Sequence, residues 1–317
     1  MVRATVIYNP RAGRFNVAHM LPPVRSALGD MDWDVRICTV GEGRDNNLNT
    51  LARAACDCRA DVVFVAGGDG SVGAVAAVLS GSEVAMGVLP CGTGNVWARG
   101  LGLAVPAHPW SAVLVSAAQR QATGSARNVD LGSCNGRMFL QWAGVGLGGH
   151  IVHGVEPRGR IARHFGRWHY IARGMWLARS WPGASVRVRG GNTGFEGEIV
   201  ATVATNVPAY AGGLATLDLE ARAQDGRLAL WAFRGNGFGD ALAQFGRLLF
   251  GHHQAHRDVE RVVAPSFELE SEKELPLQLD GEPAGTAMRF EIKVIPRALR
   301  VLVPHRIGPT GWPDYWR

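Results

Sequence analysis

The chain has 317 residues, a length that favours two domains of ordinary size. Hydrophobic residues make up 47% and charged residues 19% of the sequence, a globular mixture that excludes a largely disordered chain. The net charge of +6 favours anionic partners such as nucleotides, nucleic acid or anionic lipid surfaces, without choosing among them. This charge is almost entirely arginine, because the only lysines are Lys273 and Lys293.

The cysteines and the apolar runs indicate a cellular location. Five cysteines are scattered along the sequence, and no leader pattern opens it, so we expect reduced thiols in a cytoplasmic protein. No run reaches the roughly 18 apolar residues of a membrane span. Any lipid contact is therefore expected to be peripheral, at the inner face of the membrane.

Short apolar runs alternate with helical patterns in the first part of the sequence, as in a parallel sheet with crossover helices. The runs predict strands at residues 5–8, 35–40, 62–66 and 84–89. The helical patterns predict helices at residues 17–28, 47–56, 72–79 and 96–101. We expect an α/β nucleotide-binding domain at residues 1–128, with residues 296–317 packing back on it.

From about Val129 the pattern changes to the alternation that is typical of antiparallel strands. One helical pattern interrupts it at residues 161–176, with Trp168 and Met175 on the apolar face and arginines on the other. This part predicts a second, mainly antiparallel β domain at residues 129–295.

The strongest motif is Gly67-Gly68-Asp69-Gly70-Ser71, between a predicted buried strand and a helix. Glycines there let backbone N–H groups and a helix N-terminus approach phosphate oxygens. Asp69 could face a metal-bound phosphate or hold a hydrogen-bond donor. The same residues also fit a tight turn in which Asp or Ser caps the helix.

A second glycine turn, residues 90–95, follows the next predicted strand. Ligands of open α/β sheets bind at such carboxyl ends of strands. No P-loop pattern occurs and no lysine lies near either turn, so we expect the backbone to hold the phosphates. Gly144 to Gly149 fit a dinucleotide-binding pattern, but the acidic residue expected about 20 positions later is missing.

Taken in order, these motifs resemble the diacylglycerol kinase catalytic-domain family, which includes bacterial lipid kinases and sphingosine kinases. Further landmarks of the resemblance span nearly the whole chain: residues 9–13, 128–132, 139–148, 212–213, 225–228 and 280–282. The resemblance implies an α/β domain with a parallel sheet, similar to NAD kinase and phosphofructokinase, followed by a mainly antiparallel β-sandwich. It also implies ATP and Mg²⁺ as cofactors.

The resemblance implies which residues surround the nucleotide. They are Asn9, Pro10, Arg11, Ala12, Gly13, Thr39, Gly67, Gly68, Asp69, Gly70, Ser71, Val72, Gly73, Ala74, Thr93, Gly94 and Asn95. It implies Glu282 as the general base, with Asp130 as its partner, and Asp69 is a third catalytic candidate. From the residues alone, Glu282 is equally a solvated acid after the Asp280-Gly281 turn.

The resemblance also implies a structural cation, Mg²⁺ or Ca²⁺, held by Asp225 and the backbone of Arg222 and Arg227. Asp225-Gly226 fits a type I′ hairpin turn equally well. Two positions depart from the family pattern: Val96 replaces an acidic residue, and Val72-Gly73-Ala74 replaces a polar pair. Either the catalytic metal is held chiefly by Asp69 and the phosphates, or activity is weak.

The basic, tryptophan-rich stretch at residues 158–181 has two interpretations. It rests on an anionic membrane, with Trp168, Trp176 and Trp181 at the interface, or it packs its aromatic face on the β domain. No nucleic-acid-binding module is recognised, so we expect no nucleic-acid partner. The oligomeric state is open, and a homodimer is one option.

The sequence therefore predicts an ATP-dependent kinase that phosphorylates the hydroxyl of a diacylglycerol-like or sphingoid lipid. Two alternatives remain open. The first is a kinase of a soluble alcohol or a dinucleotide, and the second is a non-catalytic regulator that binds a nucleotide or a lipid.

Overall fold

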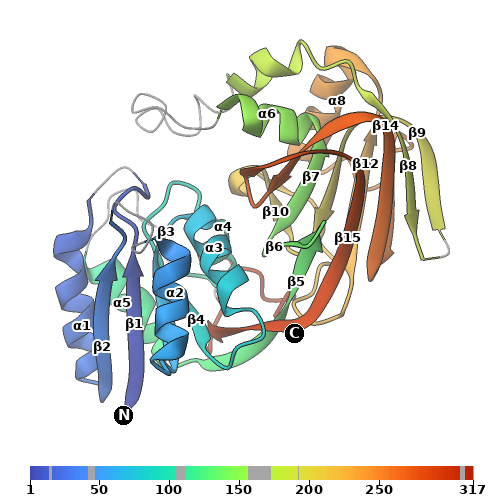
Figure 1. Ribbon diagram of the computed structural model, residues 1–317. Helices are drawn as coiled ribbons and strands as arrows, with labels where there is room; N and C mark the ends of the chain where they lie inside the picture. The colour runs from blue at the N-terminus through green and yellow to red at the C-terminus, as the bar shows by residue number, and fades with distance from the viewer. Residues whose placement is uncertain are drawn as a thin grey trace. The chain divides into compact units, whose positions relative to one another are not determined.

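The structure is a computed structural model that describes residues 1–13, 16–41, 47–103, 111–155, 173–191, 193–307 and 311–316. It divides into two compact units (Figure 1). Unit 1 comprises Met1–Val129 with Arg297–Arg317, and unit 2 comprises Asp130–Pro296. Among the described helices, none is long and apolar enough to cross a bilayer.

Unit 1 is an α/β domain whose parallel sheet has the strand order β15-β4-β3-β1-β2. Helices α1 and α5 pack together, as do α2 and α3, and the two pairs cover opposite faces of the sheet (Figure 1). Its elements are β1 (Val2–Tyr8), η1 (Ala18–Met20), α1 (Leu21–Gly29), β2 (Trp33–Thr39), α2 (Leu48–Asp57), β3 (Val62–Gly67), α3 (Asp69–Leu79), β4 (Ala85–Pro90), α4 (Val96–Gly100) and α5 (Ser111–Ala122).

The central strands β3 and β4 are buried along their whole length. Strands of a parallel sheet with helices on both faces are apolar throughout, which explains the unbroken runs from Val62 to Ala66 and from Ala85 to Leu89. The helix Leu48–Asp57 begins at Asn47, whose side chain accepts a hydrogen bond from the N–H of Thr50.

Unit 2 is built mainly from antiparallel strands in the order β13-β12-β9-β7-β14-β15, with β8 pairing with β9 and β14. Phe267, Phe290, Ile199, Leu230 and Leu277 lie in its apolar core. Its elements are β6 (Arg137–Phe139), β7 (Trp142–Gly146), α6 (Leu147–Val155), β8 (Ala184–Gly190), β9 (Thr193–Thr205), β10 (Ala209–Tyr210), η3 (Ala211–Gly213), β11 (Ala215–Thr216), β12 (Leu228–Arg234), α8 (Gly237–Leu249), β13 (Val259–Ala264) and β14 (Ser266–Leu279).

Two long strands belong to both units. Strand β5 (Ser125–Cys134) begins in unit 1 and ends in unit 2. Strand β15 (Glu282–Val303) pairs with β14 over most of its length in unit 2, and its Arg300 and Val301 pair with β4 in unit 1.

The predicted fold class, an α/β domain followed by a β-sandwich, is confirmed, and three helices add to it. Helices α5, α6 and α8 were not predicted. Glycines within α6 and α8 weaken the helical signal of their sequences, because glycine has a low helix propensity. Helix α6 follows β7 where the dinucleotide-binding pattern lies, but β7 pairs antiparallel with both neighbours, so this is no Rossmann unit.

The tryptophan-rich stretch requires a correction. Trp181 is buried and its indole N–H donates to the carbonyl of Val200 at 2.9 Å, so Trp181 cannot lie at a membrane interface. Met175, expected on the packed face, is exposed. Trp168 and the first part of the predicted helix lie outside the described residues, and residues 173–178 are helical.

Gln121 of α5 is a buried polar side chain that completes the hydrogen bonds of β4. Its Oε1 accepts from the N–H of Val88 at 2.9 Å, and its Nε2 donates to the carbonyl of Val88 at 2.8 Å. The Gln121 side chain therefore supplies the two hydrogen bonds that a neighbouring strand would make to Val88.

Replacing Gln121 with leucine should lower the free energy of unfolding by about 3 kcal/mol, because two buried backbone groups of Val88 lose their partner. Urea unfolding followed by circular dichroism measures the change. Gln119→Leu on the exposed side of α5 is the matched control and should change stability little. Equal effects of both substitutions would contradict this role of Gln121.

Candidate functional site

The predicted nucleotide residues of unit 1 lie at one edge of its sheet. Three segments follow the carboxyl ends of β1, β3 and β4: the Asn9 turn (residues 9–13), the Gly68 loop (residues 67–71) and the Gly92 loop (residues 90–95). The parallel register places Tyr8 opposite Ala66, and Gly67 opposite Pro90. Thr39, at the end of β2, is opposite Tyr8. This edge is where open α/β sheets bind ligands.

Asn9 joins the Asn9 turn to the Gly68 loop. Its backbone N–H donates to the carbonyl of Ala66 at 3.0 Å, and its side-chain Nδ2 donates to the hydroxyl of Ser71 at 2.9 Å. Its Oδ1 accepts from the N–H of Arg11 at 3.0 Å, which folds the turn back on itself. Asn9 is thus a positioning residue for both segments.

The glycines allow the three segments to approach one another closely. Gly13 has a φ of +72°, and a Cβ there would lie 2.0 Å from the carbonyl oxygen of Cys91. A Cβ on Gly92 would lie 2.4 Å from the Cα of Gly68. The N–H of Cys91 also donates to the carbonyl of Gly67 at 3.1 Å. Backbone therefore lies directly on backbone, as a phosphate cradle made of N–H groups requires.

The N-terminus of α3 has the features of an anion site. Its N-cap residue is Gly68, which has no side chain. The N-cap residue therefore supplies no side-chain acceptor to the N–H groups in the first turn of the helix. The helix dipole adds partial positive charge at this end. These features fit the phosphates of a nucleotide.

Asp69 connects the Gly68 loop with α4. It is half-buried, and its Oδ1 accepts from the N–H of Trp97 at 3.3 Å. Asp69 thus accepts a hydrogen bond from the backbone of α4, and holding a donor is one of the two roles expected of this residue. Its carboxylate oxygens are also the kind of ligand that Mg²⁺ prefers.

Asn95 closes the Gly92 loop on itself. Its side chain accepts from the N–H of Gly92 at 2.8 Å and donates to the carbonyl of Gly92 at 2.8 Å. The next residue, Val96, is buried in the interior of unit 1. A metal held at this edge must therefore take its ligands from residues other than Val96.

An aromatic cluster supports α4 and was not anticipated from the sequence. Trp97 packs edge-on against Trp312, Tyr315 and Trp316 near the end of the chain. The indole of Trp316 and the backbone N–H of Trp312 both donate to the carbonyl of Gly100, at 3.0 and 2.9 Å. The concentration of aromatic residues in the last segment of the sequence was the available signal.

In unit 2, Asp130 and Asp225 lie close together. Asp130 is buried on β5, and its Oδ2 accepts from the N–H of Gly226 at 2.7 Å. Asp225 keeps an exposed side chain, but partial desolvation raises its pKa, and the charge of Asp130 raises it further, while the N–H of Arg227 donates to its Oδ1 at 3.0 Å. A cation beside these carboxylates would offset the cost of their charges.

The loop around Asp225 is not a β-hairpin turn. It precedes β12 and joins no pair of neighbouring strands, so the type I′ hairpin alternative is wrong. Across the described ranges, no cluster of three or more His, Cys, Asp or Glu side chains could hold a metal. A cation here would need backbone carbonyls such as those of Arg222 and Arg227.

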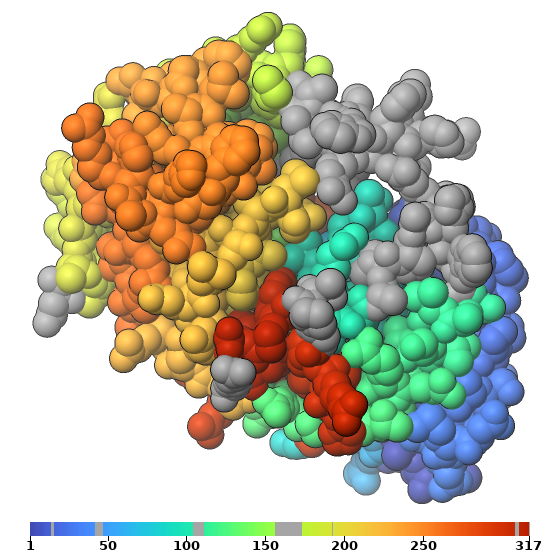
Figure 2. All heavy atoms as spheres, turned by 180° about the vertical axis from the view of Figure 1, so that it is seen from behind, coloured from blue at the N-terminus to red at the C-terminus, as the bar shows by residue number. Residues whose placement is uncertain are grey.

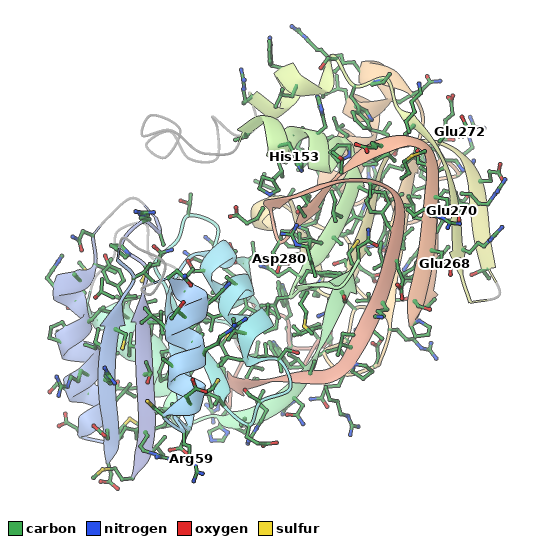
Figure 3. The ribbon with its side chains drawn as sticks, viewed as in Figure 1. Arg59, His153, Glu268, Glu270, Glu272 and Asp280 are labelled. Atoms are coloured by element: carbon green, nitrogen blue, oxygen red, sulfur yellow. The ribbon has the colours of Figure 1, made fainter. Side chains whose placement is uncertain are left out.

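Glu282 is exposed and follows a tight turn that is firmly anchored. Asp280 and Gly281, with φ values of 51° and 83°, join Leu279 to its strand partner Glu282. The Asp280 carboxylate accepts from the N–H groups of Leu140, Gln141 and Trp142 at 2.8, 2.7 and 3.1 Å. Figure 3 shows Asp280 at the end of this hairpin.

Asn206 joins the Asp130 and Asp280 segments and was missed in the sequence. It is buried, and its Nδ2 donates to the carbonyls of Asp130 and Leu140 at 2.8 and 2.9 Å. Leu140 in turn donates its N–H to Asp280. A lone asparagine at the end of β9 carries no sequence signal of this role.

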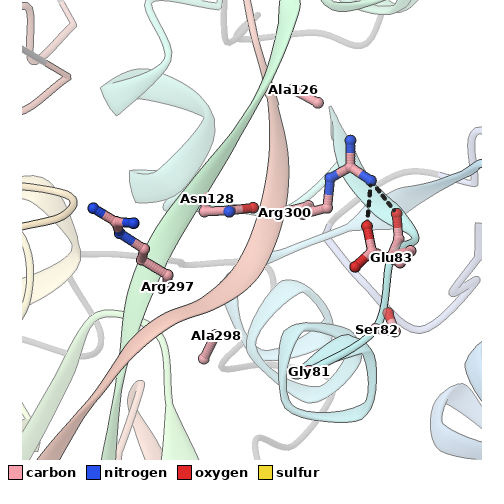
Figure 4. Close-up of a pocket in the computed structure, with 8 residues that line it drawn as sticks. All are labelled: Gly81, Ser82, Glu83, Ala126, Asn128, Arg297, Ala298 and Arg300. Carbon is pink, nitrogen blue, oxygen red and sulfur yellow. Dashed lines mark hydrogen bonds and ion pairs between the residues drawn. The ribbon is translucent and has the colours of Figure 1, made fainter.

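Unit 1 also has a cavity of about 350 Å³, whose lining residues are drawn in Figure 4. Its lining includes Gly81 to Glu83, which precede β4, so it is at the opposite end of β4 from the Gly92 loop. Arg300 is already bound to Glu83, with Nη1 2.8 Å from the carboxylate. The other residues that line the cavity are Ala126, Asn128, Arg297 and Ala298.

Comparison with known proteins agrees with this architecture. Residues 3–134 match the family described as the diacylglycerol kinase catalytic domain. Residues 155–303 match the family described as the YegS C-terminal NAD kinase beta sandwich-like domain.

Similar proteins extend over nearly the whole chain. A diacylglycerol kinase of Bacillus subtilis (strain 168) is 26% identical over 96% of this chain and 97% of its own. A Chromohalobacter salexigens protein named "Probable lipid kinase YegS-like" is 30% identical over 90% of this chain and 89% of its own. The crystal structure of a diacylglycerol kinase from Bacillus anthracis str. Sterne has the same fold, with a TM-score of 0.69, 20% identity, and coverage of 96% of this chain and 98% of the other.

The chain belongs to the diacylglycerol kinase catalytic-domain family. Membership of this family makes it a phosphotransferase with an alcohol group as acceptor.

Replacing Gly92 with alanine should lower the free energy of unfolding by about 1–3 kcal/mol, because the new Cβ overlaps the backbone of Gly68 and forces it to shift. Thermal unfolding measures the change. Gly29→Ala is the control, because a Cβ there meets nothing within 4 Å. If Gly92→Ala is as stable as Gly29→Ala, the two loops are not packed as described.

Proposed function

We propose that the protein is an ATP-dependent lipid kinase that phosphorylates the hydroxyl of a diacylglycerol-like or sphingoid lipid. The observation that carries this proposal is the N-terminus of α3, which has no side-chain cap and lies between glycine segments from β1 and β4. The relatives named as diacylglycerol kinase and lipid kinase support the lipid acceptor.

In this proposal the backbone of unit 1 holds the nucleotide. N–H groups of the Gly68 loop and of the first turn of α3 donate to phosphate oxygens, and Asn9 and Asn95 keep the neighbouring segments in place. Mg²⁺, when bound, would neutralise charge on the phosphates, and Asp69 is a carboxylate at this edge that could hold it. Phosphoryl transfer depends mainly on such positioning and charge neutralisation.

We propose Glu282 as the general base that accepts the proton of the lipid hydroxyl. The exposed position of Glu282 leaves it accessible to an acceptor, and the Asp280 anchor holds its backbone in place. Asp130 acts as a positioning residue, because its side chain binds the Asp225 loop and its carbonyl binds Asn206. Fixing a base in this way lowers the entropy cost of reaching the transition state.

Glu282→Gln should lower kcat by about 100-fold or more, the usual contribution of a general base, and leave the Kd for ATP unchanged. Transfer of labelled phosphate to a panel of extracted lipids and soluble alcohols gives kcat, and calorimetry gives Kd. Glu272→Gln on β14 is the matched control (Figure 3) and should retain full activity.

The outcomes separate the alternatives. Normal turnover by Glu282→Gln would show that the base is another group. Phosphate transfer to soluble alcohols or dinucleotides, but to no lipid, would show that the acceptor is a soluble molecule. ATP binding without phosphate transfer to any acceptor would indicate a non-catalytic regulator.

We also propose that Asp225, with the carbonyls of Arg222 and Arg227, binds Mg²⁺ or Ca²⁺. The raised pKa of Asp225 means that its contribution to stability is present below its ordinary value of 3.8 and is lost as pH rises through its higher pKa in the folded protein. Asp225→Asn should therefore be more stable than the parent near pH 7 without divalent ions, with the difference shrinking as the pH falls towards 4.

Added Ca²⁺ or Mg²⁺ should reverse this order. An ion at 100 times its Kd stabilises the parent protein by about 2.7 kcal/mol and leaves Asp225→Asn unchanged. Urea unfolding with and without the ion measures both effects. Equal stabilisation of the two proteins would place the ion elsewhere.

A further inference from the structure

Helix α8 of unit 2 carries a partly exposed apolar row beside its core side. Phe238, Leu242, Phe245 and Leu249 recur at intervals of four, three and four residues, so they lie on one side of the helix. The core side of α8 is formed by other residues, Ala241, Gln244 and Leu248. We call the apolar row, together with Phe250 directly after the helix, the α8 ridge.

The α8 ridge is exposed to an extent that is unusual for large apolar side chains. Phe250 is 77% exposed, Leu242 48% and Leu249 40%, and Phe238 and Phe245 are half-buried. Figure 2 shows α8 and the following turn (orange) at the surface of unit 2, bordered by the yellow-green segment that contains residues 173–183. A contiguous exposed apolar surface of this kind marks an interaction site.

The neighbouring helical segment extends this surface with an aromatic residue and arginines. Trp176 is 58% exposed, and the guanidinium of Arg173 lies 4.6 Å from the centre of its ring. The guanidinium of Arg179 lies 5.6 Å from the ring of Phe238, which joins this segment to the α8 ridge. Arginines stacked on exposed aromatic rings match the boundary between lipid headgroups and acyl chains.

The charges around the α8 ridge favour an anionic surface. Residues 173–183 contain Arg173 and Arg179 and no acidic residue. Near the far end of α8, Asp258 forms ion pairs with Arg247 and Arg257 and lies 3.6 Å from the Nδ1 of His256, and Asp240 accepts a hydrogen bond from the N–H of Asn236. Asp240 and Asp258 thus both have hydrogen-bond or ion-pair partners, while Arg257 remains highly exposed.

These charges argue against a second copy of the chain as the occupant. A twofold interface joins the same surface patch of both subunits, so the arginines of one copy would face residues of that patch on the other copy. Neither the α8 ridge nor residues 173–183 offer Arg173 and Arg179 an acidic side chain to pair with. An anionic bilayer satisfies the arginines and the apolar row together.

We propose that the α8 ridge, with Trp176, Arg173 and Arg179, is the surface by which the protein docks on an anionic lipid bilayer. This deepens the proposed function and rests on it, since a lipid acceptor has to be reached at a membrane. The apolar row enters the headgroup region, and the arginines bind lipid phosphates.

Sedimentation of the full chain with vesicles tests the proposal. Vesicles of phosphatidylcholine with phosphatidylglycerol should bind the protein, and vesicles of phosphatidylcholine alone should bind it about tenfold less well. The double variant Leu242→Ser with Phe250→Ser should bind the anionic vesicles about tenfold more weakly, because it removes two exposed apolar groups. Arg173→Gln with Arg179→Gln should lose most of the preference for phosphatidylglycerol.

Leu219→Ser is the matched control, because Leu219 is 63% exposed and lies outside the ridge. It should bind vesicles as the parent does, and circular dichroism should show all variants folded. The double variant should phosphorylate a short-chain, water-soluble diacylglycerol at the parent rate, and long-chain diacylglycerol in vesicles at a reduced rate.

Unchanged vesicle binding by Leu242→Ser with Phe250→Ser would overturn the docking proposal. So would a parent dimer that this variant abolishes while vesicle binding persists, because the ridge would then be a subunit interface. Vesicle binding that depends on the ridge, in a protein that phosphorylates no lipid, would support docking and overturn the lipid substrate instead.

Discussion

The parallel pairing of β1, β3 and β4 is the constraint on which the nucleotide side of this protein depends. In-register parallel strands end at a common edge, so segments that are far apart in the sequence emerge side by side. Glycines at positions 13, 68 and 92 then let backbone touch backbone, which a side chain would prevent. The absence of lysine near these segments follows from the same design, because N–H groups and a helix terminus supply the positive potential that a P-loop lysine would otherwise provide.

In unit 2, hydrogen bonds of the polypeptide around it fix the position of the turn that carries the exposed Glu282. The turn before Glu282 is fixed by Asp280, whose carboxylate accepts hydrogen bonds from three consecutive N–H groups between β6 and β7. Asn206 ties that segment to Asp130, and Asp130 binds the Asp225 loop. A series of short hydrogen bonds thus links four motifs that the sequence presents separately. Buried networks of this kind are costly to leave incomplete, so they specify one arrangement.

The fold class could be read from the sequence because the two kinds of periodicity differ along the chain. Apolar runs between helical patterns mark the parallel sheet, and alternation from Val129 onward marks the antiparallel one. The glycine segments could be placed because strand order fixes their common edge. Helix α8 could not, since Gly239 and Gly246 hide its pattern, and neither could Asn206 or Gln121, whose roles depend on partners 66 and 33 residues away. The burial of Trp181 could not be predicted from the sequence either. A basic, tryptophan-rich stretch can place a tryptophan in the core or at a membrane interface.

The discontinuity of unit 1 has a consequence for how the protein is made. Its sheet is finished by Arg300 and Val301 of β15, which leave the ribosome after all of unit 2 has been synthesised. Until then β4 has an open edge at Ala85 and Met86, and α4 lacks its aromatic support from Trp312 and Trp316. Unpaired edges of this kind are prone to wrong pairing. A nascent chain stalled before residue 300 would therefore expose this edge of β4, and unit 1 is completed only after the residues of unit 2 have been synthesised.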